Sequence, residues 1–128
     1  MILVLLDMHE LSIALSMIEM ASEEAARRGS FHVAAIHLKL GALSGVVKDA
    51  LTFSFEIACQ GTALERSQLI IEDVPVTIHC SSCREEHATN TIQDLRCPRC
   101  GGTETKVVRG KDLEVVAIEL EEAEELVS

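Results

Sequence analysis

Aromatic residues are scarce in this chain of 128 residues, which has three phenylalanines and neither tryptophan nor tyrosine. Proteins that bind single-stranded nucleic acid stack its bases on aromatic rings, so this class of protein is disfavoured. Positive charge is also scarce, because 11 basic side chains stand against 21 acidic ones and the formal net charge is −10. Such a charge repels a phosphate backbone and attracts cations and basic protein surfaces. We therefore expect no nucleic-acid partner.

Long apolar runs are absent as well. Residues 1–6 are apolar, but they have no basic region before them and no small-residue cleavage site. The run is also too short for the core of a signal peptide or for a membrane span. We therefore expect a cytoplasmic protein with no membrane segment. Apolar residues make up 48% of the chain, which predicts a globular fold of one domain that carries at most a small inserted module.

Four of the five cysteines form two close pairs, Cys80-Ser-Ser-Cys83 and Cys97-Pro-Arg-Cys100. Two residues between cysteines allow one tight turn to present both sulfurs to a single ion, and two such turns complete a tetrahedron. The pattern predicts a structural Zn²⁺ site in a reducing compartment, with arginines 84, 96 and 99 to offset part of the thiolate charge. Four cysteine ligands leave no open position for a substrate, so we expect no enzyme.

Other residues near or like these ligands have more ordinary interpretations. A pair of redox-active CxxC motifs is disfavoured, since neither pair stands at a strand-to-helix junction. His79 and His87 are close enough in sequence to replace a cysteine as alternate zinc ligands, although each also fits an ordinary surface histidine. Cys59 is expected to be a buried, inert thiol. The remaining histidines, His32 and His37, are expected on the polar face of a strand.

Apolar spacing predicts two helices. The first begins near Leu11 and stops at Gly29, and its apolar stripe is Leu11, Ala14, Leu15, Ile18, Ala21 and Ala25. The second runs from about Val46 to Cys59, and its apolar face is Val47, Leu51, Phe55 and Ala58. Alternating or continuous apolar residues predict strands over 33–40, 69–74 and 113–120.

The polar, cysteine-rich segment lies between the second and third predicted strands. We therefore expect the chain to leave the sheet at Val76 and to return near Val107. The predicted fold is α+β: a small three-stranded sheet with two helices, over 8–76 and 107–122, with an inserted zinc-ribbon-like module over 77–106. Residues 1–7 and 123–128 are expected to be an extension and an acidic tail.

The segment Met8-His9-Glu10-Leu11-Ser12 opens the first predicted helix. It is not the start of a metalloprotease HExxH motif, because Ile13 stands where the second histidine belongs. On residue chemistry alone it fits a helix start, with Asp7 as a cap and an acidic side chain that favours the helix dipole. A metal-binding role is the alternative.

Several segments together resemble the HypA/HybF family, the nickel metallochaperones of nickel–iron hydrogenase maturation. They are the Met-His-Glu-Leu-Ser opening, Gly41-Ala42-Leu43-Ser44, Phe53-Ser54-Phe55-Glu56, Cys59-Gln60-Gly61-Thr62 and the paired CxxC module. The resemblance, which extends from Met8 to about Glu121, implies a nickel-binding α/β domain with an inserted zinc domain. It implies that Ni²⁺ is a transient cargo bound at Met8, His9 and Glu10. It also implies transfer toward the hydrogenase large-subunit precursor with a nickel-binding GTPase; some members serve urease.

The chain departs from this family at two places. Seven residues precede the methionine with which the family begins, yet a terminal amine, a backbone amide and the next imidazole suit square-planar Ni(II) only if Met8 is first. We hypothesise that Met8 is the biological start and that residues 1–7 are a non-native or disordered extension. The second departure is Val47, which stands where some members carry an aspartate near nickel; Asp49 is close by, and we do not transfer that ligand.

Two further possibilities concern function and assembly. A zinc ribbon that binds protein or nucleic acid would explain the cysteines, but it leaves the helix-opening His-Glu pair without a role. A homodimer formed through an exposed sheet edge is compatible with so small a sheet, although no motif predicts it.

Overall fold

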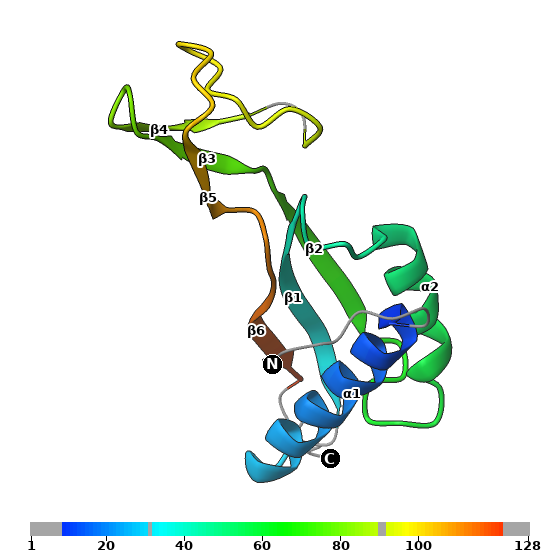
Figure 1. The fold of residues 1–128 in the computed structure, drawn as a ribbon. Helices are drawn as coiled ribbons and strands as arrows, with labels where there is room; N and C mark the ends of the chain where they lie inside the picture. The colour runs from blue at the N-terminus through cyan, green and yellow to red at the C-terminus, as the bar shows by residue number, and fades with distance from the viewer. Residues whose placement is uncertain (1–8, 31, 90–91, 122–128) are drawn as a thin grey trace. The chain divides into compact units, whose positions relative to one another are not determined.

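The computed structural model describes residues 9–30, 32–89 and 92–121, and it describes His9 by its backbone alone. Two helices and six strands form in these residues (Figure 1). They are α1 His9–Arg27, β1 Val33–Gly41, α2 Lys48–Ala58, β2 Gln68–Val74, β3 Thr77–Cys80, β4 Glu85–Ala88, β5 Thr105–Arg109 and β6 Leu113–Leu120. The strands make two three-stranded sheets, ordered β2-β1-β6 and β4-β3-β5. The predicted α+β class is confirmed.

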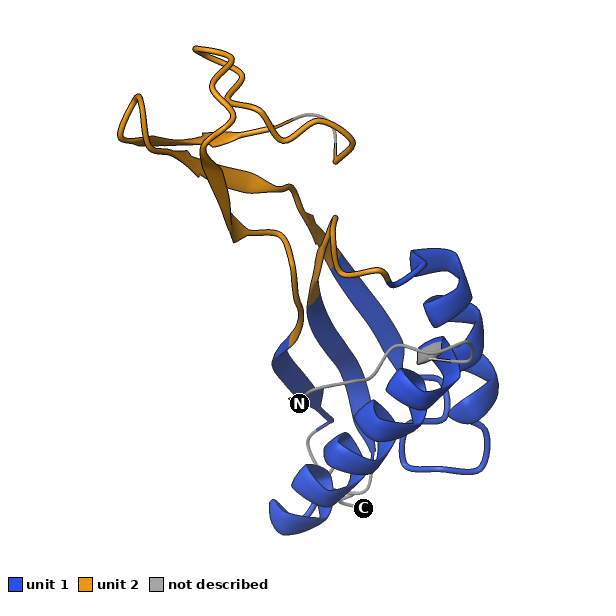
Figure 2. Ribbon diagram, in the orientation of Figure 1, with its two compact units in different colours: residues 1–38, 46–71, 115–128 blue, residues 39–45, 72–114 orange. Residues whose placement is uncertain are grey.

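The described residues divide into two compact units (Figure 2). The first contains those within 1–38, 46–71 and 115–128, and the second those within 39–45 and 72–114. The second unit thus takes in the whole predicted module and further residues on both sides of it. No helix in the described part of the chain is long and apolar enough to cross a membrane.

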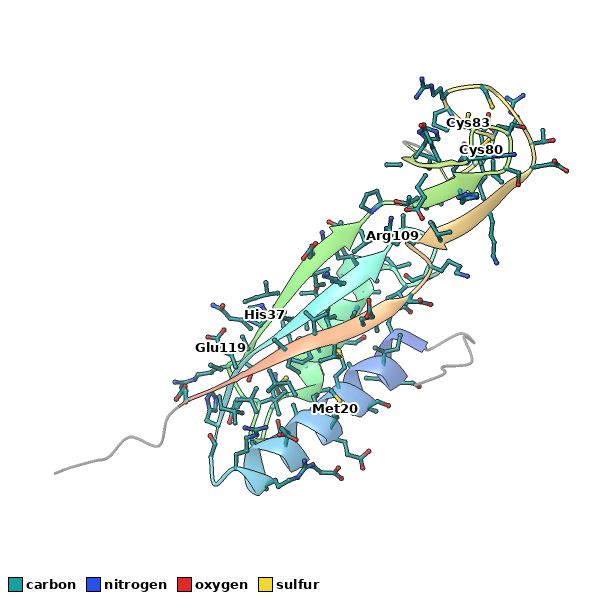
Figure 3. The ribbon with its side chains drawn as sticks, turned by 90° about the vertical axis from the view of Figure 1, so that its left-hand side faces the viewer. Met20, His37, Cys80, Cys83, Arg109 and Glu119 are labelled. Carbon is teal, nitrogen blue, oxygen red and sulfur yellow. The ribbon has the colours of Figure 1, made fainter. Side chains whose placement is uncertain are left out.

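In the first unit, α1 and α2 contact each other and lie on the same face of the β2-β1-β6 sheet (Figures 1 and 3). β1 supplies the centre of this sheet. Its Ile36, Leu38 and Leu40 are buried, while His37 is half-buried and Lys39 is exposed, so the predicted alternation holds from Ile36 onward. Val33 and Ala35, which the alternation places on the polar face, are buried as well. The side chains of one parity therefore face the helices.

Both predicted helix faces need correction. The buried face of α1 is Ile13, Ala14, Met17, Ile18, Ala21 and Ala25, and Leu15, which was expected to be buried, is 51% exposed. Leu15 lies about 100° around the helix from Ala14, beyond the edge of the stripe that packs on the sheet. In the second helix Leu51 and Phe55 are buried as predicted, but Val47, which caps the helix, is 59% exposed.

The second unit has its own small core of Val76, Ile78, Cys80 and Cys97. Val107 packs against this core and pairs with Ile78 across β3 and β5. The expected return of the chain to the first sheet near Val107 is therefore wrong, and the return comes at Leu113, where β6 begins. An apolar residue in a short strand can pack in either sheet, and the strand joins the sheet in which that residue finds a packing partner.

Candidate metal centre

The two cysteine pairs occupy turns of the same form. In the first turn, which follows β3, Arg84 N–H donates to the Cys80 carbonyl at 2.7 Å, and Arg84 has a φ of 59°. In the second turn Gly101 N–H donates to the Cys97 carbonyl at 2.8 Å, and Gly101 has a φ of 76°. In each case the fourth residue after the first cysteine adopts the left-handed conformation, which closes the turn and directs both sulfurs inward.

Backbone N–H groups also point at the sulfurs. Cys83 N–H donates to Cys80 Sγ at 3.5 Å, and Cys100 N–H donates to Cys97 Sγ at 3.5 Å, so the two turns match again. Gly102 N–H donates to Cys100 Sγ at 3.4 Å. A Cβ atom at Gly102 would lie 3.3 Å from the same sulfur, so a side chain here would crowd the site. These donors stabilise thiolate over thiol.

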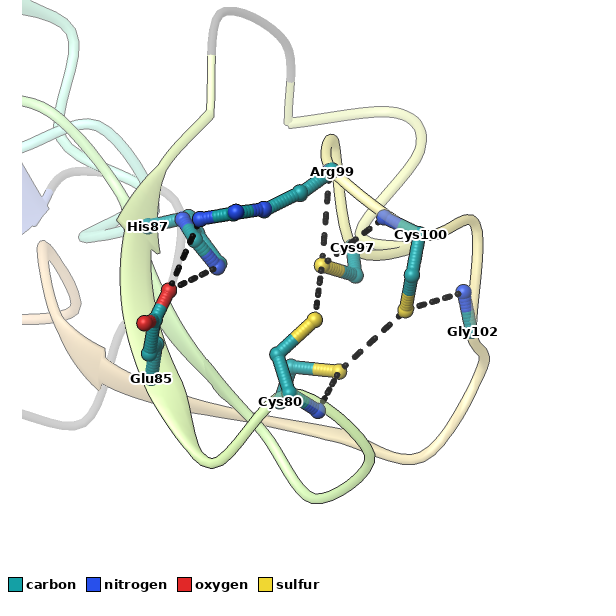
Figure 4. A network of polar contacts seen from close by, with 8 residues as sticks. Cys80, Glu85, His87, Cys97, Arg99, Cys100 and Gly102 are labelled. Atoms are coloured by element: carbon teal, nitrogen blue, oxygen red, sulfur yellow. Dashed lines mark hydrogen bonds and ion pairs between the residues drawn. The ribbon is translucent and has the colours of Figure 1, made fainter.

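The four sulfurs converge on one point (Figure 4). All lie within 4.8 Å of one another, with 3.7 Å between Cys80 and Cys100 and 3.9 Å between Cys83 and Cys97. A Zn–S bond of about 2.3 Å places neighbouring sulfurs of a tetrahedron about 3.8 Å apart. The spacing fits a four-thiolate zinc site and is far too long for disulfides. The structure therefore holds a four-cysteine cluster suited to zinc.

The pKa values of two cysteines show why the site needs a cation to hold four thiolates together. Burial by itself raises the pKa of Cys97, but the N–H groups of Cys100 and Arg99 outweigh it and the pKa falls to about 6. The pKa of Cys83 rises to about 12, first because of its interaction with the Cys100 thiol and then because of burial. One sulfur of the cluster ionises readily and another resists, because thiolates that share a site repel one another. A divalent cation removes that conflict.

Two of the three arginines predicted to offset thiolate charge, Arg96 and Arg99, are paired with carboxylates. Arg99 pairs with Glu85 at 3.2 Å, which links the second turn to the strand that follows the first turn (Figure 4). Arg96, expected to offset thiolate charge, instead pairs with Asp94 at 2.8 Å and lowers the pKa of that carboxyl group to about 2. Arg96 therefore offsets less thiolate charge than predicted, because the carboxylate of Asp94 compensates its own charge.

The two candidate histidine ligands lie outside the cluster. Among the described residues, the side chains close enough to share a metal are the four cysteines, without His79 or His87. His87 is half-buried, with its Nε2 3.7 Å from Glu85 Oε1. This nitrogen is buried and makes no hydrogen bond.

The N-terminal motif opens α1 as predicted, and the structure adds a contact that the sequence does not reveal. Met8 lies outside the described residues, and His9 is the first residue of the helix. Glu10 is half-buried, and its Oε2 accepts a hydrogen bond from Val47 N–H at 3.0 Å. Val47 has no side-chain cap of its own, so Glu10 occupies the start of α2. Asp49 is exposed in the first turn of the same helix.

The other candidate side chains have structural surroundings. Cys59 is 3% exposed, which confirms the predicted burial, and burial raises its pKa to about 11, as an inert thiol requires. His32 lies between Glu121 Oε2, at 2.9 Å from its Nδ1, and the Glu65 carbonyl, at 2.5 Å from its Nε2. His37 Nε2 lies 3.0 Å from Glu119 Oε1. Both histidines are half-buried with polar partners; His37 lies on the polar face of β1 as expected, and His32 directly precedes that strand.

Known proteins resemble this chain over nearly its whole length. The family described as "Hydrogenase/urease nickel incorporation, metallochaperone, hypA" matches residues 8–120. The hydrogenase maturation factor HypA of a Roseiflexus species is 46% identical over 115 residues, which cover 90% of this chain and 94% of the relative. The corresponding protein of Chloroflexus aurantiacus is 48% identical over 112 residues, which cover 88% and 98%.

Solved structures share the fold. The solution structure of the nickel metallochaperone HypA from Helicobacter pylori matches 87% of this chain and 96% of its own, with a TM-score of 0.59 and 20% identity. Another solution structure of a HypA protein covers 88% and 96%, with a TM-score of 0.67 and 21% identity. With a family match over 113 positions, from 8 to 120, and relatives near 48% identity, this chain belongs to the HypA family of metallochaperones for nickel incorporation into hydrogenase and urease.

Proposed function

We propose that this chain binds Ni²⁺ at Met8, His9 and Glu10 and delivers it for assembly of the nickel–iron hydrogenase active site. The observation that carries the proposal is that the family match begins at Met8, so the Met-His-Glu motif opens the matched segment. An amine, a deprotonated amide and an imidazole are the nitrogen donors that square-planar Ni(II) favours. Ligands at the end of a chain also release an ion more readily than a closed cage does.

Glu10 has a second task in this proposal. Its Oε2 is held by the Val47 backbone at 3.0 Å, which positions the carboxylate between the start of α1 and the start of α2. A carboxylate fixed in this way is oriented toward a metal by its hydrogen-bond partner, as supporting residues orient ligands in other metal sites. Val47 therefore contributes through its backbone, although its side chain offers no ligand.

The test replaces His9 with alanine, with His37→Ala as the matched control, since that histidine pairs with Glu119 on the sheet. Nickel binding is measured by isothermal titration and zinc content by elemental analysis. Maturation is measured as hydrogenase activity in cells that lack their own family member. His9→Ala is expected to lose nickel binding and maturation and to keep its zinc, while His37→Ala keeps all three. Normal maturation by His9→Ala would refute the nickel assignment.

The proposal also places the start of the functional protein at Met8, with residues 1–7 outside it. A chain that begins at Met8 offers its amine to nickel, whereas the longer chain offers only an amide there. Protein that starts at Met8 should therefore bind nickel more tightly than protein that starts at Met1. The intact mass of the protein purified from its native host decides the start, and a mass that includes residues 1–7 contradicts this part of the proposal.

We further propose that two parts of the chain bind different metals. Residues 77–106 hold structural Zn²⁺ through Cys80, Cys83, Cys97 and Cys100. Residues 8–76 with 107–122 bind nickel. The proposed partners are a nickel-binding GTPase and the hydrogenase large-subunit precursor, and urease is a second client. Co-purification of tagged chain with each candidate, with and without nickel, tests these partners. Recovery of urease components alone would change the client.

A further inference from the structure

The strand β6 is an outer strand of the first sheet, which is ordered β2-β1-β6. On its inner side it follows β1, and Glu121 N–H donates to the His32 carbonyl at 3.2 Å just beyond its end. Within the described residues, no strand pairs with its outer side. An outer strand of this length is a template for another extended chain unless side chains discourage pairing.

A groove runs beside this strand. It has a volume of about 450 Å³, and it is lined by Met20, Glu24 and Arg28 of α1 and by Val115, Val116, Ala117, Ile118 and Leu120 of β6. Met20 is 40% exposed and Val116 is 49% exposed, so two large apolar side chains from different elements meet solvent in one place. Figure 3 shows Met20 on α1 and Glu119 at the end of the sheet. This apolar surface lies beside an edge that no described strand covers, where the side chains of an added strand could pack.

The charges of β6 distinguish between two possible pairing partners, a second copy of this strand and a strand of another protein. Glu114 and Glu119 are exposed, and they stand one residue inside either end of Leu113–Leu120. Antiparallel pairing of two copies of β6 in full register would place Glu114 of each copy opposite Glu119 of the other. Like charges directly opposite each other destabilise a strand pair, so this edge disfavours a second copy of itself.

A partner strand with basic side chains opposite Glu114 and Glu119 would make both of these contacts attractive. Glu119 remains 59% exposed although it pairs with His37, so it is accessible to a second cationic partner. The residues between the two glutamates are Val115, Val116, Ala117 and Ile118. Side chains of β6 alternate between the two faces of the sheet, so every second apolar side chain of an incoming strand would lie on the face that carries Met20.

We propose that β6 and its groove dock an extended segment of a partner protein that carries two basic residues five positions apart, with apolar residues between them. The inference rests on the proposed function for the existence of a partner, and it names the chemistry of that partner's binding segment. The backbone of β6 supplies hydrogen bonds, the groove receives alternate side chains, and the two glutamates set the register.

The test uses the full chain and a fluorescent peptide, Val-Lys-Val-Thr-Val-Thr-Lys-Thr, whose lysines fall opposite Glu119 and Glu114 in the antiparallel register. Binding is measured by fluorescence anisotropy and located by amide chemical shifts. We expect the shifts to map to residues 113–120. We also expect Glu114→Lys to weaken binding about fivefold, from one cross-strand pair turned from attractive to repulsive. Glu23→Lys, an exposed glutamate on α1, is the matched control and should leave binding unchanged.

Several results would overturn the proposal. They are no binding of the lysine peptide, equal binding of a peptide with glutamates in place of the lysines, equal effects of the two substitutions, or shifts that map to β2. A dimer of the chain alone that Glu114→Lys changes, as seen by sedimentation, would show that the occupant is a second copy. Nickel titration of the same samples separates the two proposals: a chain that binds nickel but not the peptide refutes only the docking edge.

Discussion

Replacing Gly41 with alanine is expected to destabilise the second unit strongly. A Cβ atom at this position would lie 2.4 Å from both the carbonyl carbon and the oxygen of Gly110, and 3.0 Å from the Asp112 nitrogen. These are backbone atoms, so rotation of a side chain cannot relieve the clash. The same segment is joined by Gly41 N–H to the Asp112 carbonyl and by Leu43 N–H to the Gly110 carbonyl, each at 2.8 Å.

The magnitude follows from these contacts. Overpacking a tight site costs about 1–3 kcal/mol, and each backbone hydrogen bond that the shift breaks costs about 1 kcal/mol more. We expect a loss of about 3 kcal/mol in the free energy of unfolding. Gly29→Ala is the control, because Gly29 has a φ of 74° and, among the described residues, a methyl group there would meet no atom within 4 Å beyond its chain neighbours. It should cost only the left-handed conformation, about 1 kcal/mol.

The assay is urea unfolding followed by far-ultraviolet circular dichroism, since the chain has no tryptophan to report fluorescence. With a slope of about 1.5 kcal/mol per molar urea, the midpoint should fall by about 2 M for Gly41→Ala and by less than about 1 M for Gly29→Ala. Equal shifts for the two variants would show that Gly41 can accept a side chain and would refute the close approach. Zinc content measured alongside shows whether the second unit still holds its metal.

Four further predictions follow from single residues. Phe55→Ala should cost about 3–5 kcal/mol because Phe55 is 1% exposed, whereas Phe53→Ala, at a residue 64% exposed, should cost less than about 1 kcal/mol by the same urea assay. Cys59 should resist a thiol reagent at pH 8 in the folded chain, because it is buried with a pKa of about 11; modification within minutes, located by mass spectrometry, would contradict this. Zinc affinity should fall as pH falls, and more steeply below about pH 6, where Cys97 also takes up a proton; a constant affinity from pH 7.5 to 5.5 in chelator competition would contradict it. Gly102→Val should speed zinc loss to a chelator, since the new Cβ would lie 3.3 Å from a ligand sulfur; an unchanged rate would show that the turn adapts.

Local patterns account for the parts of the molecule that the sequence predicts. Each CxxC pair is a short turn whose geometry depends on four neighbouring residues, so the spacing alone predicts that both pairs can share an ion. The helices and the strands of the first sheet follow from apolar periods of 3.6 and 2 within single segments. Their observed bounds differ from the predicted ones by two residues at most, which is within the usual uncertainty at element ends.

What depends on distant segments was decided only by the tertiary structure. Leu15 and Val47 are apolar residues at the edges of helical stripes, and contacts with other elements decided that they are exposed. Val107 joined the second sheet because Ile78 lies opposite it, and no pattern within 105–109 states this. The bond from Val47 to Glu10 spans 37 residues of sequence, so no local signal could reveal it.

The same division holds for function. The spacing of the cysteines predicts their cluster, and the Met-His-Glu motif suggests the proposed nickel ligands, because the identity of a donor atom is a property of single residues and their spacing. The packing of distant segments places Glu10 at the start of α2, and it leaves one edge of β6 without a partner strand among the described residues. Hydrogen bonds and open edges are relations between segments far apart in the chain, and packing alone brings such segments together.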